Sequence, residues 1–78
     1  MSDDVRKLVG RNVARLRKAA DITQAELAAR MDVDRAYISG LERGERNPTI
    51  SSIARVSAAL GTKISALFEE AAKRTKSV

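Results

Sequence analysis

The feature that most constrains this chain is a pair of short helix signals, only a few residues apart, within residues 23 to 47. Thr23 can cap the free backbone amides at a helix start, and Glu26, three residues later, can reach back to it, as in a capping box. Apolar residues then recur at helical spacing: Leu27, Ala28 and Met31. The pattern predicts a helix that begins at Gln24 and ends near Met31, with one buried face.

A tight turn and a second helix complete this stretch. Asp32 to Asp34 are expected to form the turn, with Val33 pointing inward and Asp34 capping the next helix. That helix is predicted to run from Arg35 to about Arg43 and to stop at Gly44. The order helix, turn, helix follows for residues 23 to 43.

The second helix has an unusual distribution of side chains. Its inner face collects Ile38, Leu41 and Glu42, and its outer face is predicted to carry Ala36, Ser39, Gly40 and Arg43. A glycine inside a helix costs about 1 kcal/mol relative to alanine, so small outward residues indicate that a partner approaches the backbone closely. With Arg35 and Tyr37 at its start, such a helix suits the major groove of DNA. The alternative is an ordinary surface helix.

The composition limits the partners of this helix pair. The chain has 78 residues, no cysteine, no histidine and a formal net charge of +5. A single small domain without disulfides or the usual zinc ligands must gain stability from packing or from dimerisation, and we expect no metal and no cofactor. The positive charge indicates a polyanion, either nucleic acid or an acidic membrane surface.

The membrane alternative is disfavoured by the apolar pattern. No run of about 18 apolar residues is present to span a bilayer. The N-terminal residues lack the basic and then apolar order of a signal peptide, and the apolar stripe of the helix over about residues 4 to 19 lacks the aromatic anchors of a membrane-surface helix. We expect a cytoplasmic protein with no membrane partner.

Further signals predict three more helices around this pair. Ser2 precedes two aspartates and a helix over about residues 4 to 19, which has the apolar stripe Val5, Val9, Val13 and Leu16. Thr49 caps a helix from Ile50 to Leu60, which ends at Gly61. A fifth helix is expected to begin near Lys63 or Ile64. The basic tail over about residues 73 to 78 is expected to be disordered.

Four sequence blocks resemble the Cro and phage-repressor class of regulators, the XRE family. They are VGRNVARLR, ITQAELA, YISGLERGERNPT and ALGTKISALF, and they occur in family order over about residues 9 to 68. The resemblance implies an all-α, five-helix DNA-binding domain. The segment DRAYISGLERGERNPT is most similar to the controller proteins of restriction-modification systems, which bind their own promoters as dimers.

The resemblance also implies an ion pair between Arg17 and Glu42. Each of these residues lies at the edge of an apolar face, where an unpaired charge is costly. The turn departs from the family pattern, because Asp32 stands where glycine is common. Aspartate adopts left-handed backbone more readily than most residues, so the turn is expected to persist with mild strain.

The DNA contacts can be divided by position. Gln24, in the first turn of its helix, is expected to bind a phosphate, and Arg35 is expected to make a bidentate contact to guanine. Ala36 is placed to touch a thymine methyl group. The remaining predicted contacts to bases, phosphates or a groove edge are Tyr37, Ser39, Arg43, Arg46 and Asn47.

Dimerisation is expected through the last predicted helix. Ile64, Leu67 and Phe68 form more apolar surface than a short terminal helix needs, and the resemblance implies a homodimer on a palindromic DNA site. The alternative is that all three side chains pack within one monomer, as Leu67 at least is expected to do. Phe68 is the residue expected to be shared.

Other functions fit the sequence less well. An enzyme is disfavoured because there is no histidine or cysteine and the carboxylates are scattered. One tyrosine and one phenylalanine offer little stacking surface for RNA bases. An antitoxin or another protein-interaction module with the same fold stays as the alternative. No small-molecule ligand is expected, and the sequence does not distinguish an activator from a repressor.

Overall fold

The computed structural model describes residues 2–70, so the tail predicted to be disordered lies outside the described residues. This part of the chain contains four α-helices, one short 3-10 helix and no strand. Their bounds are α1 Asp3–Ala19, α2 Gln24–Met31, α3 Arg35–Glu42, α4 Ile50–Leu60 and the 3-10 helix η1 Ile64–Phe68. The all-α class is therefore confirmed.

The prediction of five α-helices was wrong, because the fifth element is the 3-10 helix η1. It has only five residues, and no side chain caps its start at Lys63. The amide of Ala66 donates to the carbonyl of Lys63 at 3.0 Å, which is the i to i+3 bond of a 3-10 turn. Short terminal helices commonly take this tighter form, because a single turn cannot build a row of α-helical hydrogen bonds.

Capping side chains set the starts of three helices. The Thr23 hydroxyl accepts from the Glu26 amide at 3.0 Å, and the Glu26 carboxylate accepts from the Thr23 amide at 2.7 Å. Ser2 accepts from Val5 at 3.2 Å at the start of α1. Thr49 caps α4 in the same way. Asp34 precedes α3 as predicted, but its side chain makes no capping hydrogen bond.

The turn between α2 and α3 depends on a left-handed aspartate. Asp32 has φ 57° and ψ 47°, so the residue that replaces the family's glycine adopts the conformation that a glycine would favour. Its amide donates to Ala29 at 3.2 Å, and the amide of Val33 donates to Ala28 at 3.0 Å. The turn thereby satisfies the last carbonyls of α2 while Val33 packs against the core.

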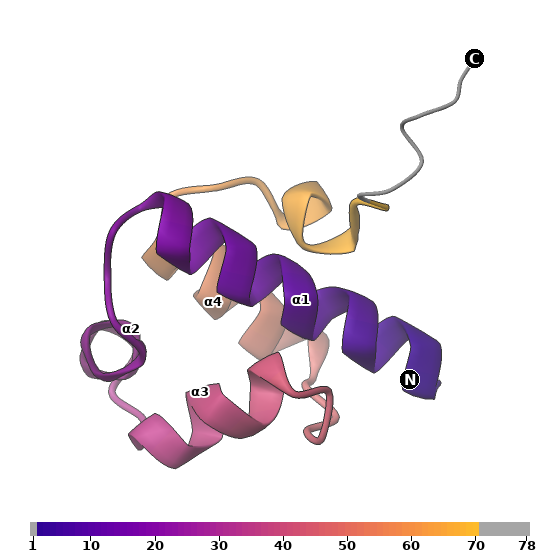
Figure 1. The fold of residues 1–78 in the computed structure, drawn as a ribbon, viewed down its shortest axis with the longest axis horizontal. Helices are drawn as coiled ribbons and strands as arrows, with labels where there is room; N and C mark the ends of the chain where they lie inside the picture. The colour runs from indigo at the N-terminus through magenta and orange to yellow at the C-terminus, as the bar shows by residue number, and fades with distance from the viewer. Residues whose placement is uncertain (1, 71–78) are drawn as a thin grey trace.

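The helices enclose one hydrophobic core. In Figure 1, α1 runs across the front, α3 lies below it, α2 stands at the left, α4 lies behind, and η1 covers the upper side of α1. Helix α2 packs against both α3 and α4. The fully buried side chains come from every one of these elements: Val9, Val13, Leu27, Ile38, Leu41, Val56 and Leu67.

Gly10 allows α1 to approach the end of α3 very closely. A Cβ atom at this position would lie 2.4 Å from the carbonyl oxygen of Leu41 and 2.6 Å from that of Glu42. These are backbone atoms, which cannot move aside as a flexible side chain would. Gly10 therefore sets the distance between α1 and α3, a role that the sequence analysis did not assign to it.

Asn12 attaches η1 to α1 from a buried position. Its Nδ2 atom donates to the carbonyl oxygens of Leu67 and Glu69, both at 2.9 Å. Its Oδ1 atom accepts from the Nε and Nη2 atoms of Arg15 at 3.2 and 3.0 Å. One buried amide group thus holds a short element that has little helical stability of its own.

We predict that Gly10→Ala lowers the free energy of unfolding by about 3 kcal/mol, because the added methyl group collides with backbone. Thermal unfolding followed by circular dichroism measures this change. Gly61→Ala is the comparison, since a Cβ there meets nothing within 4 Å and only its left-handed φ of 70° opposes the change. That variant should lose about 1 kcal/mol. A Gly10→Ala protein that gains stability, as helix propensity alone predicts, would contradict the close packing.

Candidate nucleic-acid interface

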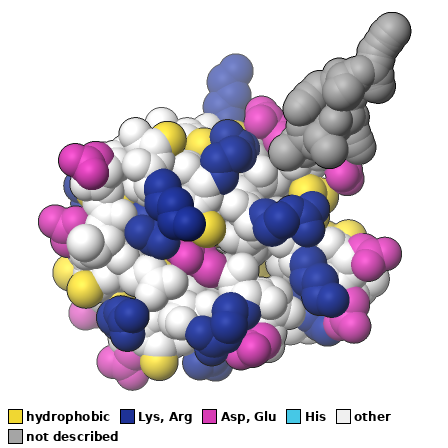
Figure 2. Space-filling model, viewed as in Figure 1, with side chains coloured by type: hydrophobic (Ala, Val, Ile, Leu, Met, Phe, Trp, Pro, Cys, Tyr) yellow, Lys and Arg dark blue, Asp and Glu magenta, His cyan; other side chains and the backbone are white. Residues whose placement is uncertain are grey.

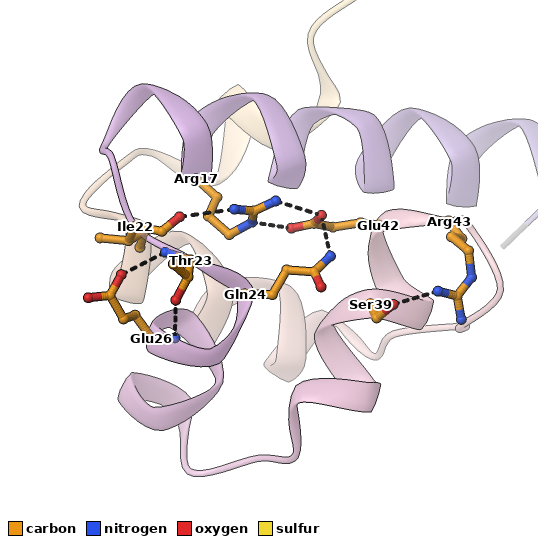
Figure 3. A network of polar contacts seen from close by, with 8 residues as sticks. All are labelled: Arg17, Ile22, Thr23, Gln24, Glu26, Ser39, Glu42 and Arg43. Carbon is orange, nitrogen blue, oxygen red and sulfur yellow. Dashed lines mark hydrogen bonds and ion pairs between the residues drawn. The ribbon is translucent and has the colours of Figure 1, made fainter.

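An ion pair joins the end of α1 to the end of α3 (Figure 3). The Nε atom of Arg17 lies 2.7 Å from Oε2 of Glu42, and Nη2 lies 3.1 Å from Oε1. Only 11% of the Arg17 side chain and 8% of the Glu42 side chain are exposed. The hydrogen bonds to Glu42 raise the pKa of Arg17, although burial acts in the opposite direction. The family resemblance implied this ion pair, and the structure shows it as a nearly buried, bidentate contact.

Two further groups complete this network. The Nη1 atom of Arg17 donates to the carbonyl oxygen of Ile22 at 2.9 Å, and Nε2 of Gln24 donates to Oε1 of Glu42 at 2.9 Å. The four residues come from α1, the connection after it, the first turn of α2, and α3. The network therefore fixes the start of α2 and the orientation of α3 relative to α1.

Gln24 has an internal role that the sequence analysis did not foresee. Its side chain points toward Glu42 in Figure 3, so one of its amide hydrogens is already used inside the protein. A side-chain amide has two hydrogens, and the second is available for another acceptor. A contact between Gln24 and a DNA phosphate stays a prediction.

The outer side of α3 carries the residues predicted to meet bases. Arg35 and Ala36 are exposed, and Tyr37 and Ser39 are partly exposed. Arg43, just after the helix, donates from Nη1 to the Ser39 hydroxyl (Figure 3). Its Nη2 atom donates to the Glu45 carboxylate at 3.0 Å. Hydrogen bonding within this exposed pair raises the pKa of Arg43 and lowers that of Glu45.

Gly40 is covered by another side chain, so its backbone is not open to the close approach of DNA that was predicted. The residue is buried, because the side chain of Arg46 folds back over it. A Cβ atom at Gly40 would lie 3.0 Å from Nε of Arg46. The Arg46 guanidinium also lies over the ring of Tyr37, 5.3 Å from its centroid. Gly40 therefore provides space for Arg46, while Asn47 beside it is exposed.

A hollow of about 660 Å³ opens at the start of α2. It is lined by the C-terminal end of α1 and by the starts of α2 and α3. It brings together Gln24 and Arg35, two of the predicted DNA contacts. Lys18 also lines it. Lys18 was not among the predicted contacts, since nothing in its local pattern distinguishes it from the other basic residues of α1.

The residues predicted to form the dimer interface lie in different environments. Leu67 is 0% exposed and packs in the core, so it cannot belong to the predicted interface. Ile64 and Phe68 are 47% and 37% exposed. Ile50, at the start of α4, is 83% exposed and was not singled out. Its place in the first turn after Thr49 is the only sequence signal of that exposure.

Two features of other protein classes, a metal-binding cluster and a membrane-spanning helix, are absent within residues 2–70. The structure contains no cluster of carboxylates that could hold a metal ion, over the residues described. In the same part of the chain, no helix is long and apolar enough to cross a membrane.

Comparisons with known proteins match this arrangement. A family model described as "Helix-turn-helix" matches residues 13–67. An uncharacterised HTH-type transcriptional regulator, y4dJ of Sinorhizobium fredii, is 50% identical over 58 residues, which cover 74% of this chain and 75% of that protein. The control protein C.MunI of a Mycoplasma species is 36% identical over 91% of this chain and 97% of its own length.

One similar solved structure contains DNA. It is the tetramer of the restriction-modification controller protein C.Esp1396I in complex with its natural 35 base-pair operator. Its sequence is 33% identical, the TM-score is 0.75, and the match covers 82% of this chain and 84% of that one.

We predict that Glu42→Ala costs about 3 to 5 kcal/mol of stability, because it leaves the Arg17 guanidinium buried without its carboxylate. Chemical denaturation measures the loss. The double variant Arg17→Met/Glu42→Leu should recover much of it, since neither charge then stays unpaired. A Glu42→Ala protein as stable as the parent would show that the pair does not hold α1 and α3 together.

Proposed function

This chain belongs to the helix-turn-helix family, in its Cro and phage-repressor (XRE) class, and we propose that it regulates transcription by binding double-stranded DNA as a homodimer. The family is one of transcriptional regulators and is not an enzyme family. A cytoplasmic location is part of this proposal.

The proposal rests on one observation: α3 is held in a fixed orientation, and the residues at its start are exposed. The buried contact between Arg17 and Glu42 holds the inner side of this helix, while Arg35 and Ala36 at its start are exposed. A rigid helix with a basic start and small neighbours can enter a major groove without reordering its backbone. The positive net charge of +5 favours the approach to a polyanion.

We propose distinct roles for the DNA-facing residues. Arg35 reads a guanine through two hydrogen bonds, and Ala36 contacts a thymine methyl group. Gln24 binds a phosphate at the start of α2, where the helix dipole favours a negative charge. The other proposed contacts, to bases or to the backbone, are Tyr37, Ser39, Arg43, Arg46 and Asn47.

A homodimer would place two copies of α3 on one palindromic site. The two recognition helices would then lie about 34 Å apart, one turn of DNA. The exposed apolar side chains of Ile64 and Phe68 support an interface that includes η1. Assembly of the similar protein C.Esp1396I as a tetramer on its operator is consistent with a symmetric arrangement.

We further propose that the chain acts as a controller protein of a restriction-modification system. The similarity to C.MunI over 91% of this chain supports this narrower role. Selection of binding sites from a random DNA library, followed by gel shift on the selected site and on DNA upstream of the gene, tests the proposal. Failure to bind any duplex with sequence preference would favour the alternative, a module that binds a protein partner.

We predict that Arg35→Ala weakens binding to the selected site by about 1 to 3 kcal/mol, because one guanine loses its bidentate partner. Fluorescence anisotropy on the selected site and on a scrambled duplex measures both affinities. Arg30→Ala is the control, since Arg30 lies on α2 and lines a different hollow. Equal losses on the two duplexes would make Arg35 a phosphate contact.

We predict that Phe68→Asp gives a helical monomer with weak binding to a half-site, because a charge replaces part of the apolar interface. Sedimentation at micromolar concentration measures the mass, and circular dichroism checks the fold. Ala29→Asp adds the same charge to the exposed side of α2 and should leave the dimer intact. A parent protein that sediments only as a monomer would remove the basis of the dimer.

A further inference from the structure

Two neighbouring hollows form one basic surface across α1 and the start of α2. The first is the hollow of about 660 Å³ that contains Gln24, Lys18 and Arg35. The second, of about 390 Å³, is lined from α1 by Arg11, Arg15 and Lys18. Because Lys18 lines both, the two hollows adjoin, and we call them together the α1 basic surface. In Figure 2, Lys and Arg side chains gather on the face that lies over α1, with acidic side chains among them.

The carboxylates beside the second hollow are already neutralised. Glu42 lies against Arg17 in the nearly buried pair, and Glu69 lies 3.3 Å from Arg15. Among the residues that the structure describes, neither Arg11 nor Lys18 has a carboxylate partner, and both are exposed. The first hollow adds the exposed Asp21 and Arg35. The α1 basic surface thus keeps a positive charge after its internal pairs are counted.

The spacing of the two unpaired cations suits a nucleic-acid backbone. Arg11 and Lys18 are seven residues apart on α1, which is two helical turns or about 10 Å on the same side of the helix. Along the axis of duplex DNA, about 10 Å spans three phosphates of one strand. Two long, solvated side chains at this spacing can follow a strand without reading its bases.

We propose that Arg11 and Lys18 bind the phosphate backbone of duplex DNA beyond the sequence that α3 reads. This inference rests on the proposed function, because the α1 basic surface continues from the hollow that holds Gln24 and Arg35. The contact lengthens the DNA footprint and makes affinity depend on the DNA that flanks the site. It adds no base specificity.

The test compares two duplexes that contain the same selected site. One is trimmed to the site, and the other extends it by about six mixed base pairs at each end, about 20 Å at the rise of duplex DNA. The parent should bind the extended duplex about tenfold more tightly than the trimmed one at low salt. Lys18→Gln should reduce this ratio to about threefold, and Arg11→Gln/Lys18→Gln should bring it to about one. On the extended duplex only, the salt dependence of the double variant should fall by about four phosphate contacts, two from each protomer of the dimer.

Arg30→Gln provides the matched control for Lys18→Gln, because it removes one positive charge from a hollow that shares no residue with the α1 basic surface. Its ratio of affinities should equal that of the parent. Equal ratios in the parent and the double variant would overturn the inference, as would a loss in Arg30→Gln as large as that in Lys18→Gln. If the parent prefers its selected site but binds the extended and the trimmed duplex equally well, this inference is wrong and the proposed function stands. A parent without preference for any site overturns the proposed function as well.

Discussion

The orientation of α3 depends on one nearly buried contact, the bidentate pair of Arg17 and Glu42. Buried ion pairs contribute little net stability compared with apolar packing, because both charges lose their hydration. What such a pair provides is geometry: the planar guanidinium accepts one arrangement of the carboxylate. Here it also binds the carbonyl of Ile22, and the carboxylate accepts from Gln24. A shift of α3 would break the contacts of Glu42 to Arg17 and to Gln24 together, so the helix is held in one orientation.

Close packing at Gly10 sets the distance between α1 and α3 across which Arg17 and Glu42 meet. Since the backbone of α1 approaches the carbonyls of Leu41 and Glu42 directly, the two helices converge near the end of α3. Farther along α1, the separation is filled by the side chains of Arg17 and Glu42, which meet at 2.7 Å. A larger side chain at Gly10 would push α1 and α3 apart. The hydrogen bond between Arg17 and Glu42 would then lengthen and weaken.

Local signals in the sequence were sufficient for most helix bounds. The capping box of Thr23 and Glu26 fixed the start of α2, and Thr49 with Gly61 gave both ends of α4, because these signals act over three or four residues. Local signals did not show that the last element is a 3-10 helix, and they did not show what covers each side chain. Gly40 lies under Arg46 of the following loop, and Leu67 is buried in η1, where Asn12 of α1 donates to its carbonyl oxygen. Helical periodicity gives the direction of a side chain, but it does not say what covers it.

The basic residues of the candidate site differ in how much freedom they must lose on binding DNA. Arg46 already lies between the Tyr37 ring and Gly40, and Arg43 is held by Ser39 and Glu45. Arg35 has no such internal contact among the described residues, and neither do Arg11 and Lys18. Ordering a long side chain costs about 0.5 to 1.5 kcal/mol, so the preorganised arginines bind at lower entropic cost. For Arg43, the proposed DNA contact competes with its bond to Glu45. The order in the free protein therefore favours a DNA contact by Arg46 more than one by Arg43, although both lie within four residues of the end of α3.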